Sequence, residues 1–256
     1  MDNRVERIPH IGIVAGTAEG AALCYRTLCQ EAGSVMGHRY AHPEVTLHSF
    51  SLHRYLDAID QDDWAGVAGL MTQSAAKLVQ VGADLIICPN NTLHKAFRLV
   101  ESPVPWLHIA RSVVREIEER RWRRVGILGT QTVMDGSIYS EPLGQSDIDI
   151  VTPALADRAR IQHIIRHELV AGVCTAKSAL FVQKVIAEMT CHGAEAVILA
   201  CTELPLLMAG YQTAVPLLDS TRLLARAALN YRVHEQRQLE GKCVVNRQVV
   251  AMETVS

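Results

Sequence analysis

The stretch GADLIICPNNT at residues 82–92 returns as GAEAVILACTE at residues 193–203, so the second copy begins 111 residues after the first. In each copy a glycine and an acidic residue precede a continuous apolar run, and a short polar cluster follows it. The alignment places Cys201 opposite Asn90. Repetition over so long a period indicates that the chain is built from two similar units.

The beginnings of the two units also match. IGIVAGT at residues 11–17 resembles VGILGT at residues 125–130, with one residue of slippage. Both apolar runs end in a glycine followed by a threonine, Thr17 in the first unit and Thr130 in the second. Each unit therefore begins with one apolar strand and contains a second one later, before its polar cluster.

The apolar runs predict buried parallel strands. They occupy residues 11–14, 85–88, 125–128 and 197–200. Runs that do not alternate polar and apolar residues are typical of parallel strands covered on both faces. Amphipathic stretches such as residues 66–81 and 176–191 lie between them and have helical spacing. The predicted fold class is α/β, with two pseudo-symmetric lobes, each a parallel sheet flanked by helices, and an active site in the cleft between them.

The boundary between the lobes is predicted near Pro103-Val104-Pro105. Residues 1–104 together with 214–231 are then the first α/β lobe, and residues 105–213 are the second. A segment so late in the chain is given to the first lobe because a helix from Ser220 to about Tyr231 is expected to pack back on it.

The last 25 residues, 232–256, are a C-terminal extension to which we assign no role. They are polar at first and then contain the strand-like segment 243–250. No repeat or motif of the two lobes extends into them.

Composition narrows the class of protein. The 256 residues are 49% apolar and 20% charged, and the formal net charge of −2 offers no global field for nucleic acid or anionic membrane. No apolar run reaches the roughly 18 residues that span a bilayer. The N-terminus lacks the basic, apolar and small-residue order of a signal peptide. We expect a cytoplasmic protein with neither a nucleic-acid nor a membrane partner.

Cysteines and histidines give no sign of a metal site. The seven cysteines are at positions 24, 29, 88, 174, 191, 201 and 243, without a CxxC pair or zinc spacing. An odd number without a secretion signal indicates reduced thiols, most of them in the core. His163 and His167 are four residues apart, but the His-Glu-x-x-His order is absent, so an exposed helical face is the better explanation.

Four polar clusters follow the predicted strands. They are Gly16-Thr17, Asn90-Asn91-Thr92, Gly129-Thr130 and Cys201-Thr202-Glu203. Ligands of parallel α/β sheets bind beyond the carboxyl ends of the strands, where hydroxyls, amides and N–H groups suit a carboxylate. A single cluster is more simply a helix cap. Four clusters at repeated positions favour a binding site in the cleft.

Over about residues 9–230 the chain resembles the aspartate/glutamate racemase family. The resemblance is carried by residues 11–17, by Pro89-Asn90-Asn91-Thr92-Leu93-His94, by Gly129-Thr130 and by Ala200-Cys201-Thr202-Glu203. Members usually have Cys-Asn-Thr-x-His at the second segment and Gly-Cys-Thr-Glu or Gly-Cys-Thr-His at the fourth. The resemblance implies two similar α/β lobes, a homodimer, and catalysis with neither pyridoxal phosphate nor a metal.

The resemblance also implies the chemistry. Family members use two cysteines on opposite faces of the substrate α-carbon, one to remove the α-proton and the other to return one. Here Cys201 would be the base for the L enantiomer, whereas Asn90 replaces the other cysteine and has no acid or base function near neutral pH. A water held by Asn90 would protonate the opposite face. Cys88, two residues earlier, is expected in the core.

An acidic amino acid is the substrate that the resemblance implies, aspartate first and glutamate second. Its two carboxylates would be bound by Thr17, Arg54, Asn91, Thr92, Thr130 and Thr202. Arg54 is the expected partner of the distal carboxylate. A lysine that some aspartate racemases carry is replaced by Val170.

Two other functions stay open. A one-cysteine relative that decarboxylates a malonate-like acid needs a single proton donor, but also an apolar pocket for the leaving carboxylate. A catalytically decayed protein that only binds acidic amino acids would explain Asn90, but it has no need of Cys201.

Overall fold

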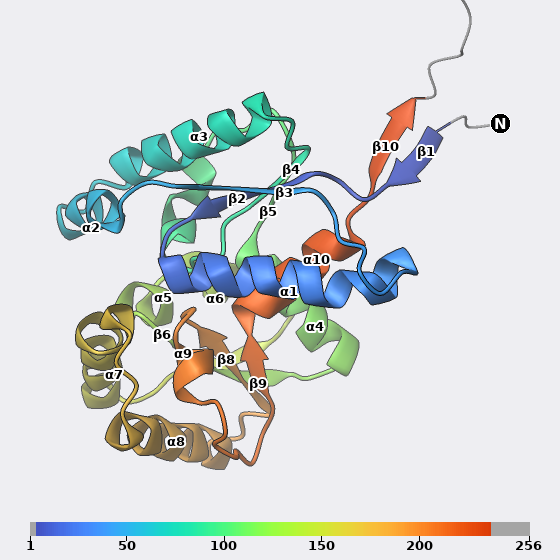
Figure 1. Ribbon diagram of the computed structural model, residues 1–256. Helices are drawn as coiled ribbons and strands as arrows, with labels where there is room; N and C mark the ends of the chain where they lie inside the picture. The colour runs from blue at the N-terminus through green and yellow to red at the C-terminus, as the bar shows by residue number, and fades with distance from the viewer. Residues whose placement is uncertain (1–3, 237–256) are drawn as a thin grey trace, which may run out of the picture.

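The computed structural model describes residues 4–236 and contains two four-stranded parallel sheets (Figure 1). The first sheet has the order β3 (Val45–Ser49), β2 (Ile11–Ala15), β4 (Leu85–Ile87), β5 (Trp106–Leu107). The second has the order β7 (Asp149–Val151), β6 (Arg124–Gly129), β8 (Ala196–Ala200), β9 (Leu217–Asp219). The two orders are equivalent strand by strand, which confirms the predicted α/β class with two similar parallel sheets.

The strand register repeats along with the order. Ile11 of β2 pairs with Leu85 at the start of β4, and Val125 of β6 pairs with Ala196 at the start of β8. Leu85 and Ala196 are 111 residues apart, as the sequence repeat requires. The repeat in the sequence is therefore a repeat of the sheet.

Helices connect and cover the strands. Those of the first half of the chain are α1 (Ala18–Met36), α2 (Leu52–Asp60), α3 (Trp64–Gln80), the 3-10 helix η1 (Thr92–Leu99) and α4 (Ile109–Arg120). Those of the second half are α5 (Gln131–Asp135), α6 (Ser137–Gly144), α7 (Leu155–His167), the 3-10 helix η2 (Leu169–Ala171), α8 (Ala176–Cys191), α9 (Leu204–Leu207) and α10 (Ser220–Asn230). Within residues 4–236, no helix combines the length and apolar character needed to cross a bilayer.

The equivalent helices α3 and α8 begin and end in the same way. Asp63 caps α3 and Thr175 caps α8, each by accepting a hydrogen bond from a backbone N–H three residues later. After each helix a glycine has positive φ, 97° at Gly82 and 87° at Gly193. A side chain would be strained in this left-handed conformation, so both copies of the repeat begin with glycine.

Both faces of the central strands are buried, as the apolar runs predict. In β2, Ile11 and Ile13 pack with α1 and α10 on one face, while Val14 packs with α3 on the other. In β8, Val197 packs on the α7 and α8 side and Ile198 on the α4 and α6 side. Helices on both sides leave only the strand ends free to form a site.

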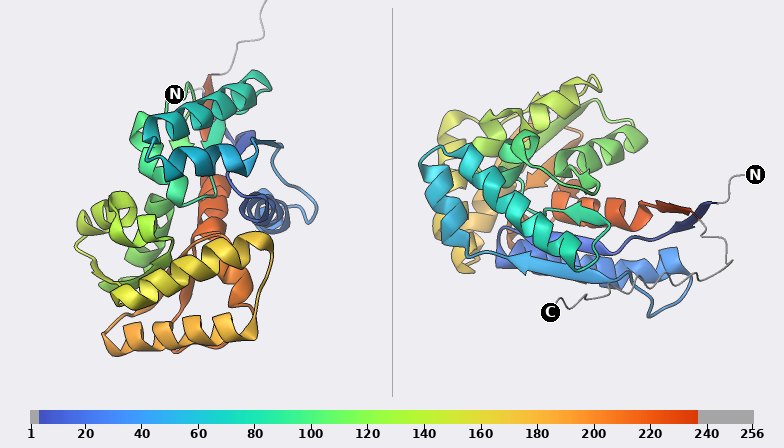
Figure 2. Two further views of the ribbon diagram at one scale, coloured as in Figure 1. Left: turned by 90° about the vertical axis from the view of Figure 1, so that its left-hand side faces the viewer. Right: turned by 90° about the horizontal axis from the view of Figure 1, so that it is seen from above.

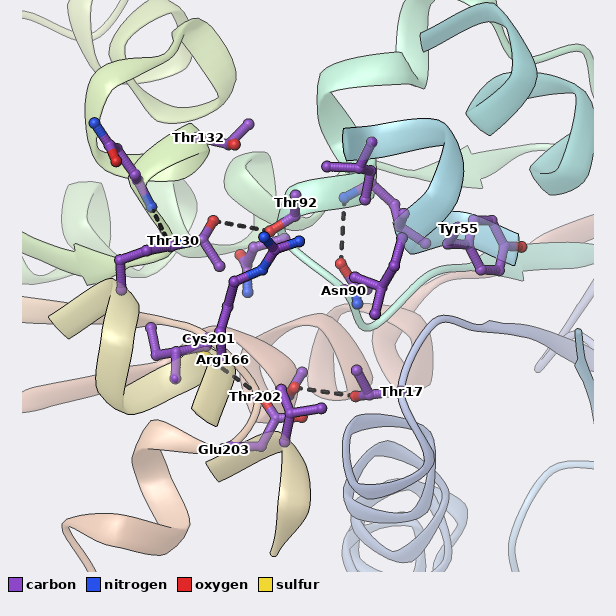
Figure 3. Close-up of a pocket in the computed structure, with 18 of the residues that line it drawn as sticks. Thr17, Tyr55, Asn90, Thr92, Thr130, Thr132, Arg166, Cys201, Thr202 and Glu203 are labelled. Atoms are coloured by element: carbon purple, nitrogen blue, oxygen red, sulfur yellow. Dashed lines mark hydrogen bonds between the residues drawn. The ribbon is translucent and has the colours of Figure 1, made fainter. Parts of the chain in front are cut away.

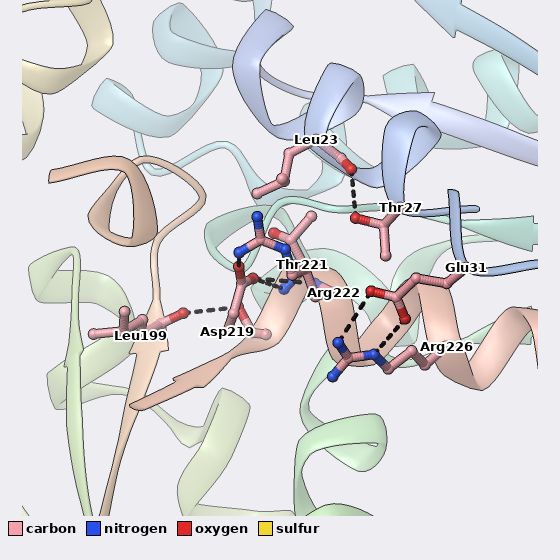
Figure 4. Close-up of polar contacts among 9 residues, drawn as sticks. Leu23, Thr27, Glu31, Leu199, Asp219, Thr221, Arg222 and Arg226 are labelled. Carbon is pink, nitrogen blue, oxygen red and sulfur yellow. Dashed lines mark hydrogen bonds and ion pairs between the residues drawn. The ribbon is translucent and has the colours of Figure 1, made fainter. Parts of the chain in front are cut away.

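Helix α10 returns from the second sheet to the first lobe and lies between the lobes (Figure 2). Its Leu224 and Ala225 belong to the same apolar cluster as Ile11. Arg226 donates two hydrogen bonds to Glu31 of α1, at 2.6 and 3.0 Å (Figure 4). The last described helix therefore completes the core of the first lobe.

Two short edge strands, β5 and β9, belong to the opposite lobe from the one to which the sequence assigned them. β5 belongs to the first sheet although residues 105–213 were assigned to the second lobe, and β9 belongs to the second sheet although residues 214–231 were assigned to the first. Each of these strands directly follows a proline, Pro105 or Pro216, so no continuous apolar run marks it in the sequence. The return to the first lobe therefore begins at Ser220 rather than at residue 214.

Pro105 and Pro216, near these boundaries, directly precede strands β5 and β9. The carbonyl of Pro105 accepts the N–H of Ile86 at 2.9 Å, and the carbonyl of Pro216 accepts the N–H of Val197 at 2.9 Å. Proline is compatible with the first residue of a strand because its carbonyl still joins the ladder.

The two ends of the described chain pair with each other. β1 (Arg4–Arg7) is antiparallel to β10 (Val233–Gln236), so the predicted extension begins with a strand. The strand-like segment predicted at 243–250 lies outside the described residues.

Candidate active site

A cavity of about 490 Å³ lies between the lobes at the carboxyl ends of the central strands (Figure 3). All four predicted polar clusters contribute to its lining, through Thr17, Asn90, Asn91, Thr92, Thr130, Cys201, Thr202 and Glu203. Parallel strands with equivalent order bring these segments to one place although they are far apart in sequence.

Two pairs of threonine hydroxyls bridge the lobes across this cavity. Thr17 lies 3.3 Å from Thr202, and Thr92 lies 2.9 Å from Thr130, measured between the side-chain oxygens (Figure 3). Each pair joins the end of a first-lobe strand to the end of a second-lobe strand. A hydroxyl can rotate to donate to a bound anion, so the four threonines suit a carboxylate placed between the lobes.

Cys201 follows β8 and is nearly buried, with 7% of its surface exposed. Its thiol donates to Oε2 of Glu203 at 3.1 Å. Burial raises the pKa of Cys201 well above its ordinary value, and the Glu203 carboxylate raises the pKa further, against backbone N–H groups of Glu203 and Leu204 that lower it. The thiol is therefore protonated in the free protein at neutral pH.

Asn90 faces the cavity from the first lobe. Its Oδ1 accepts the backbone N–H of Leu93 at 3.2 Å, which leaves the amide NH₂ as the group available to a ligand. Gly16 gives this side chain its space, since a Cβ there would lie 2.5 Å from Nδ2 of Asn90. Asn90 thus presents a donor and no base.

Glycine is also required beside Thr202. A Cβ on Gly20 would lie 2.6 Å from Cγ2 of Thr202 and 2.9 Å from the carbonyl oxygen of Pro89. The glycines at positions 16 and 20 are therefore explained by the close approach of α1 to the site.

Asn91, predicted to bind substrate, lines the cavity, and both polar atoms of its side chain already have partners in the protein. Its Nδ2 donates to Ser220 at 3.0 Å and its Oδ1 accepts from the hydroxyl of Tyr139 at 2.6 Å. Ser220 in turn donates to the carbonyl of Leu199 at 2.9 Å. Only 3% of Asn91 is exposed, and its two hydrogen bonds tie η1 to α6 and α10.

Arg54 was predicted to hold a distal carboxylate, but it is not among the residues that line the cavity. The guanidinium of this exposed residue lies over Phe50, 4.4 Å from the ring centroid. Helix α2 turns a different face to the cavity, with Leu52, Leu56 and Ile59 at helical spacing. Arg54 lies off that face.

The basic residue that does line the cavity is Arg166 of α7, which the sequence reasoning missed. Its Nη2 lies 2.7 Å from Oδ1 of Asp60, at the end of α2. Val170 lines the same cavity four residues later. Val170 lies in η2, beyond the end of α7, so its position gave no helical spacing that could have identified Arg166 in the sequence.

Cys88 has the structural role that the sequence suggested, and His94 is structural as well. Cys88 is fully buried in the first lobe, where burial raises its pKa to about 12. His94 is buried, with Nδ1 2.9 Å from the Asn90 carbonyl oxygen and Nε2 accepting the N–H of Ile109 at 3.2 Å. Burial lowers the pKa of His94 to about 4, so its ring is neutral.

His163 and His167 are exposed, with ring centroids 4.6 Å apart. Within residues 4–236 there is no group of three or more histidine, cysteine and acidic side chains that could hold a metal ion. This pair is therefore part of the outer face of α7.

The chain was compared with known proteins. It is 26% identical over 192 residues to the broad specificity amino-acid racemase RacX of Bacillus subtilis (strain 168), covering 74% of this chain and 82% of that protein. A candidate Asp/Glu racemase from Yersinia pestis has a similar structure, with a TM-score of 0.78, 29% identity, and coverage of 86% of this chain and 97% of the other. An aspartate racemase homologue from Pyrococcus horikoshii OT3 gives a TM-score of 0.69, 29% identity, and coverage of 86% and 96%.

The family model for Asp/Glu/hydantoin racemases matches residues 7–228, which include both lobes and the whole cavity lining. The amino-acid racemase among the relatives and the shared fold agree with this match, and together they indicate an isomerase. The chain belongs to the Asp/Glu/hydantoin racemase family.

Proposed function

We propose that the protein racemises an amino acid by removing the α-proton of the L enantiomer with Cys201 and returning a proton to the other face from a water held by Asn90. The observation that carries this proposal is the placement of a single thiol and an amide donor on opposite lobes of one cavity. No second thiol lines that cavity among the described residues.

Cys201 must lose its proton before it can act as a base. Its hydrogen-bond partner Glu203 is 3.1 Å away and accepts the thiol proton through that bond. The backbone N–H groups of Glu203 and Leu204 stabilise the thiolate that results. The substrate ammonium group adds positive charge to the site and favours the same ionised form.

The substrate α-carboxylate is held between the threonine pairs. Thr17, Thr92, Thr130 and Thr202 exchange their mutual hydrogen bonds for bonds to the carboxylate oxygens. Loss of the α-proton turns this carboxylate into an enolate-like group with more negative charge on oxygen, so these donors bind the transition state more strongly than the substrate.

The proton balance closes over one turnover. The Cys201 thiolate gains the α-proton and becomes a thiol, and the carbanion takes a proton from the water beside Asn90. The hydroxide left behind takes up, through solvent, the proton that Glu203 accepted, while Cys201 keeps the α-proton. The product is the D enantiomer, and the protein returns to its starting state.

Chiral analysis of a panel of L- and D-amino acids after incubation with the purified protein tests the proposal. Appearance of the opposite enantiomer supports it. Measurement of α-hydrogen exchange in heavy water separates it from a protein that only binds amino acids, because a pure binder leaves the α-hydrogen in place. Absence of both reactions across the panel would refute the racemase.

A malonate-type decarboxylase is the second candidate, and the cavity wall provides the observation that favours it. Leu52, Leu56, Ile59 and Ile165 give the cavity an apolar side, which a leaving carboxylate requires and the polar clusters alone do not offer. Carbon dioxide release from substituted malonates, with no racemisation, would identify this activity.

Three further expectations accompany the proposal. Sedimentation of the purified protein tests the homodimer, and fractionation of the producing cell tests the cytoplasmic location. Activity after exhaustive dialysis against a chelator, without added pyridoxal phosphate, tests catalysis without a cofactor.

A further inference from the structure

The ion pair between Asp60 and Arg166 joins the two lobes at the wall of the cavity. Asp60 ends α2 in the first lobe and Arg166 belongs to α7 in the second, with 2.7 Å between Oδ1 and Nη2. The Arg166 side chain extends from α7 across the pocket (Figure 3). Among the described residues that line the cavity, Arg166 is the only one with a basic side chain.

A substrate with a distal carboxylate needs this cation. Arg166 already has a carboxylate partner in Asp60, which is anchored on the protein and pays no entropy of binding. Glu203 adds a second carboxylate to the lining, and Asp135 lines the cavity as well but is paired with Arg158. A second substrate carboxylate would therefore have to share the Arg166 guanidinium with Asp60, whose negative charge lies beside it and repels it.

The rest of the wall is suited to an aliphatic side chain. Leu52, Leu56 and Ile59 form a continuous stripe on α2, and Ile165 and Val170 approach from the second lobe. Ile165 is almost fully buried, and the other four are partly or largely exposed and free to be covered by a ligand. A cavity of about 490 Å³ also has room for more than a four-carbon acid.

We propose that the Asp60–Arg166 ion pair determines specificity by withholding Arg166 from the substrate, so that the cavity selects amino acids with uncharged aliphatic side chains, such as leucine, over aspartate and glutamate. This inference rests on the proposed racemase function. It gives Asp60 the role of a specificity residue, and it reverses the order of substrates that the sequence resemblance implies.

The test compares kcat/KM for L-leucine, L-lysine and L-aspartate, measured by α-hydrogen exchange in heavy water. The wild-type protein is expected to favour leucine over aspartate by at least about tenfold. Asp60→Asn keeps the size of the side chain but removes its charge and frees Arg166. The ratio of aspartate to leucine turnover is then expected to rise at least about tenfold. Use of a ratio cancels any general loss of activity in the variant.

Two variants complete the design. Asp57→Asn removes an equal charge from an exposed position of α2 outside the cavity lining, and it is expected to leave the ratio at the wild-type value. The double variant with Asp60→Asn and Arg166→Gln lacks the freed cation and is expected to lose the gain in aspartate turnover. Such a loss would show that Asp60 acts through Arg166.

The outcomes separate the two proposals. Preference of the wild-type protein for aspartate or lysine over leucine, or an unchanged ratio in Asp60→Asn, overturns the inference while the racemase stands. Exchange with no amino acid at all overturns the racemase and this inference with it.

Discussion

Cys201 and Cys88 are both buried thiols, but only Cys201 lines the cavity. Cys201→Ser is expected to lower kcat/KM by roughly 100- to 10,000-fold, because the hydroxyl is almost never ionised near neutral pH and loss of a general base has effects of this size. Chiral product analysis measures the loss.

The matched control is Cys88→Ser, which is expected to lower the free energy of unfolding and to leave kcat/KM near the wild-type value. Its hydroxyl would lie in the apolar core of the first lobe. If Cys88→Ser were the inactive variant, the base would be assigned to the wrong thiol.

Glu203 controls the ionisation of Cys201. Because its carboxylate raises the pKa of the thiol, Glu203→Gln is expected to lower that pKa. The thiolate is the reactive form, so the acidic limb of the kcat/KM profile should move to lower pH in the variant, whatever happens to the maximal rate.

Glu188→Gln provides the comparison, since it neutralises an outlying glutamate that pairs with Lys184 at 3.2 Å. Its pH profile should coincide with that of the wild-type protein. A limb that moves to higher pH in Glu203→Gln would contradict the direction of this electrostatic effect.

Asn90 makes the two faces of the substrate unequal for isotope exchange. With L-substrate in heavy water, Cys201 can return deuterium to the face from which it took the proton, so labelled L-substrate should accumulate beside labelled D-product. With D-substrate the label should appear mainly in the L-product, because the Asn90 side presents a donor and no base.

Asn90→Cys restores a thiol on that side and should raise kcat/KM equally in both directions, since the equilibrium constant between enantiomers is one. Mass spectrometry after chiral separation follows the label. Exchange in place as rapid for D- as for L-substrate in the wild-type protein would require a competent base near Asn90 and would disprove this account.

At the scale of elements, the polar network around Asn91 holds η1, α6 and α10 together. Tyr139→Phe removes the hydroxyl that donates to Asn91 at 2.6 Å and leaves a buried carbonyl oxygen without its partner. Such a loss is expected to lower the free energy of unfolding by about 1–3 kcal/mol. Urea denaturation measures this loss in the free energy of unfolding, and the m-value is expected to stay unchanged.

Tyr55 supplies a closely matched control. It is as fully buried as Tyr139, but its hydroxyl has no hydrogen-bond partner within residues 4–236. Tyr55→Phe should therefore leave stability unchanged or raise it slightly. Equal losses in the two variants would show that ring packing, rather than the hydrogen bond to Asn91, stabilises this junction.

The strands differ in whether they could be predicted from the sequence. The central strands β2, β4, β6 and β8 appear as continuous apolar runs, and the period of 111 residues between β4 and β8 identified the two lobes. β5 and β9 directly follow prolines and left no such run. Their place is set by pairing with β4 and β8, which is a property of the folded sheet.

Some residues of the site could likewise be predicted from the sequence, and others could not. Residues directly after strands, such as Cys201 and Thr130, could be predicted because the topology of a parallel sheet fixes where they go. Arg54 and Arg166 could not be told apart in advance, because the face that a helix turns to the cleft depends on how the lobes pack. Asn91 follows a strand as well, but its side chain is hydrogen-bonded to Ser220 and Tyr139, which are distant in the sequence.

At the scale of the whole molecule, the second sheet is an insertion in the chain of the first lobe. Strand β5 ends at Leu107, and the helix that completes the first core, α10, starts only at Ser220. The two lobes therefore differ in chain continuity, although their sheets are equivalent. The second sheet is drawn from one continuous segment, while the first lobe is assembled from two.

This arrangement sets an order of events on the ribosome. At about 5–20 residues per second, the segment between Leu107 and Ser220 takes roughly 6–22 s to synthesise. Throughout that time the face of β2 that carries Ile11 and Ile13 lacks the α10 side chains that cover it in the native core. Leu223 of the same helix packs in the core of the second lobe, so both lobes reach their native packing only after α10 has been synthesised.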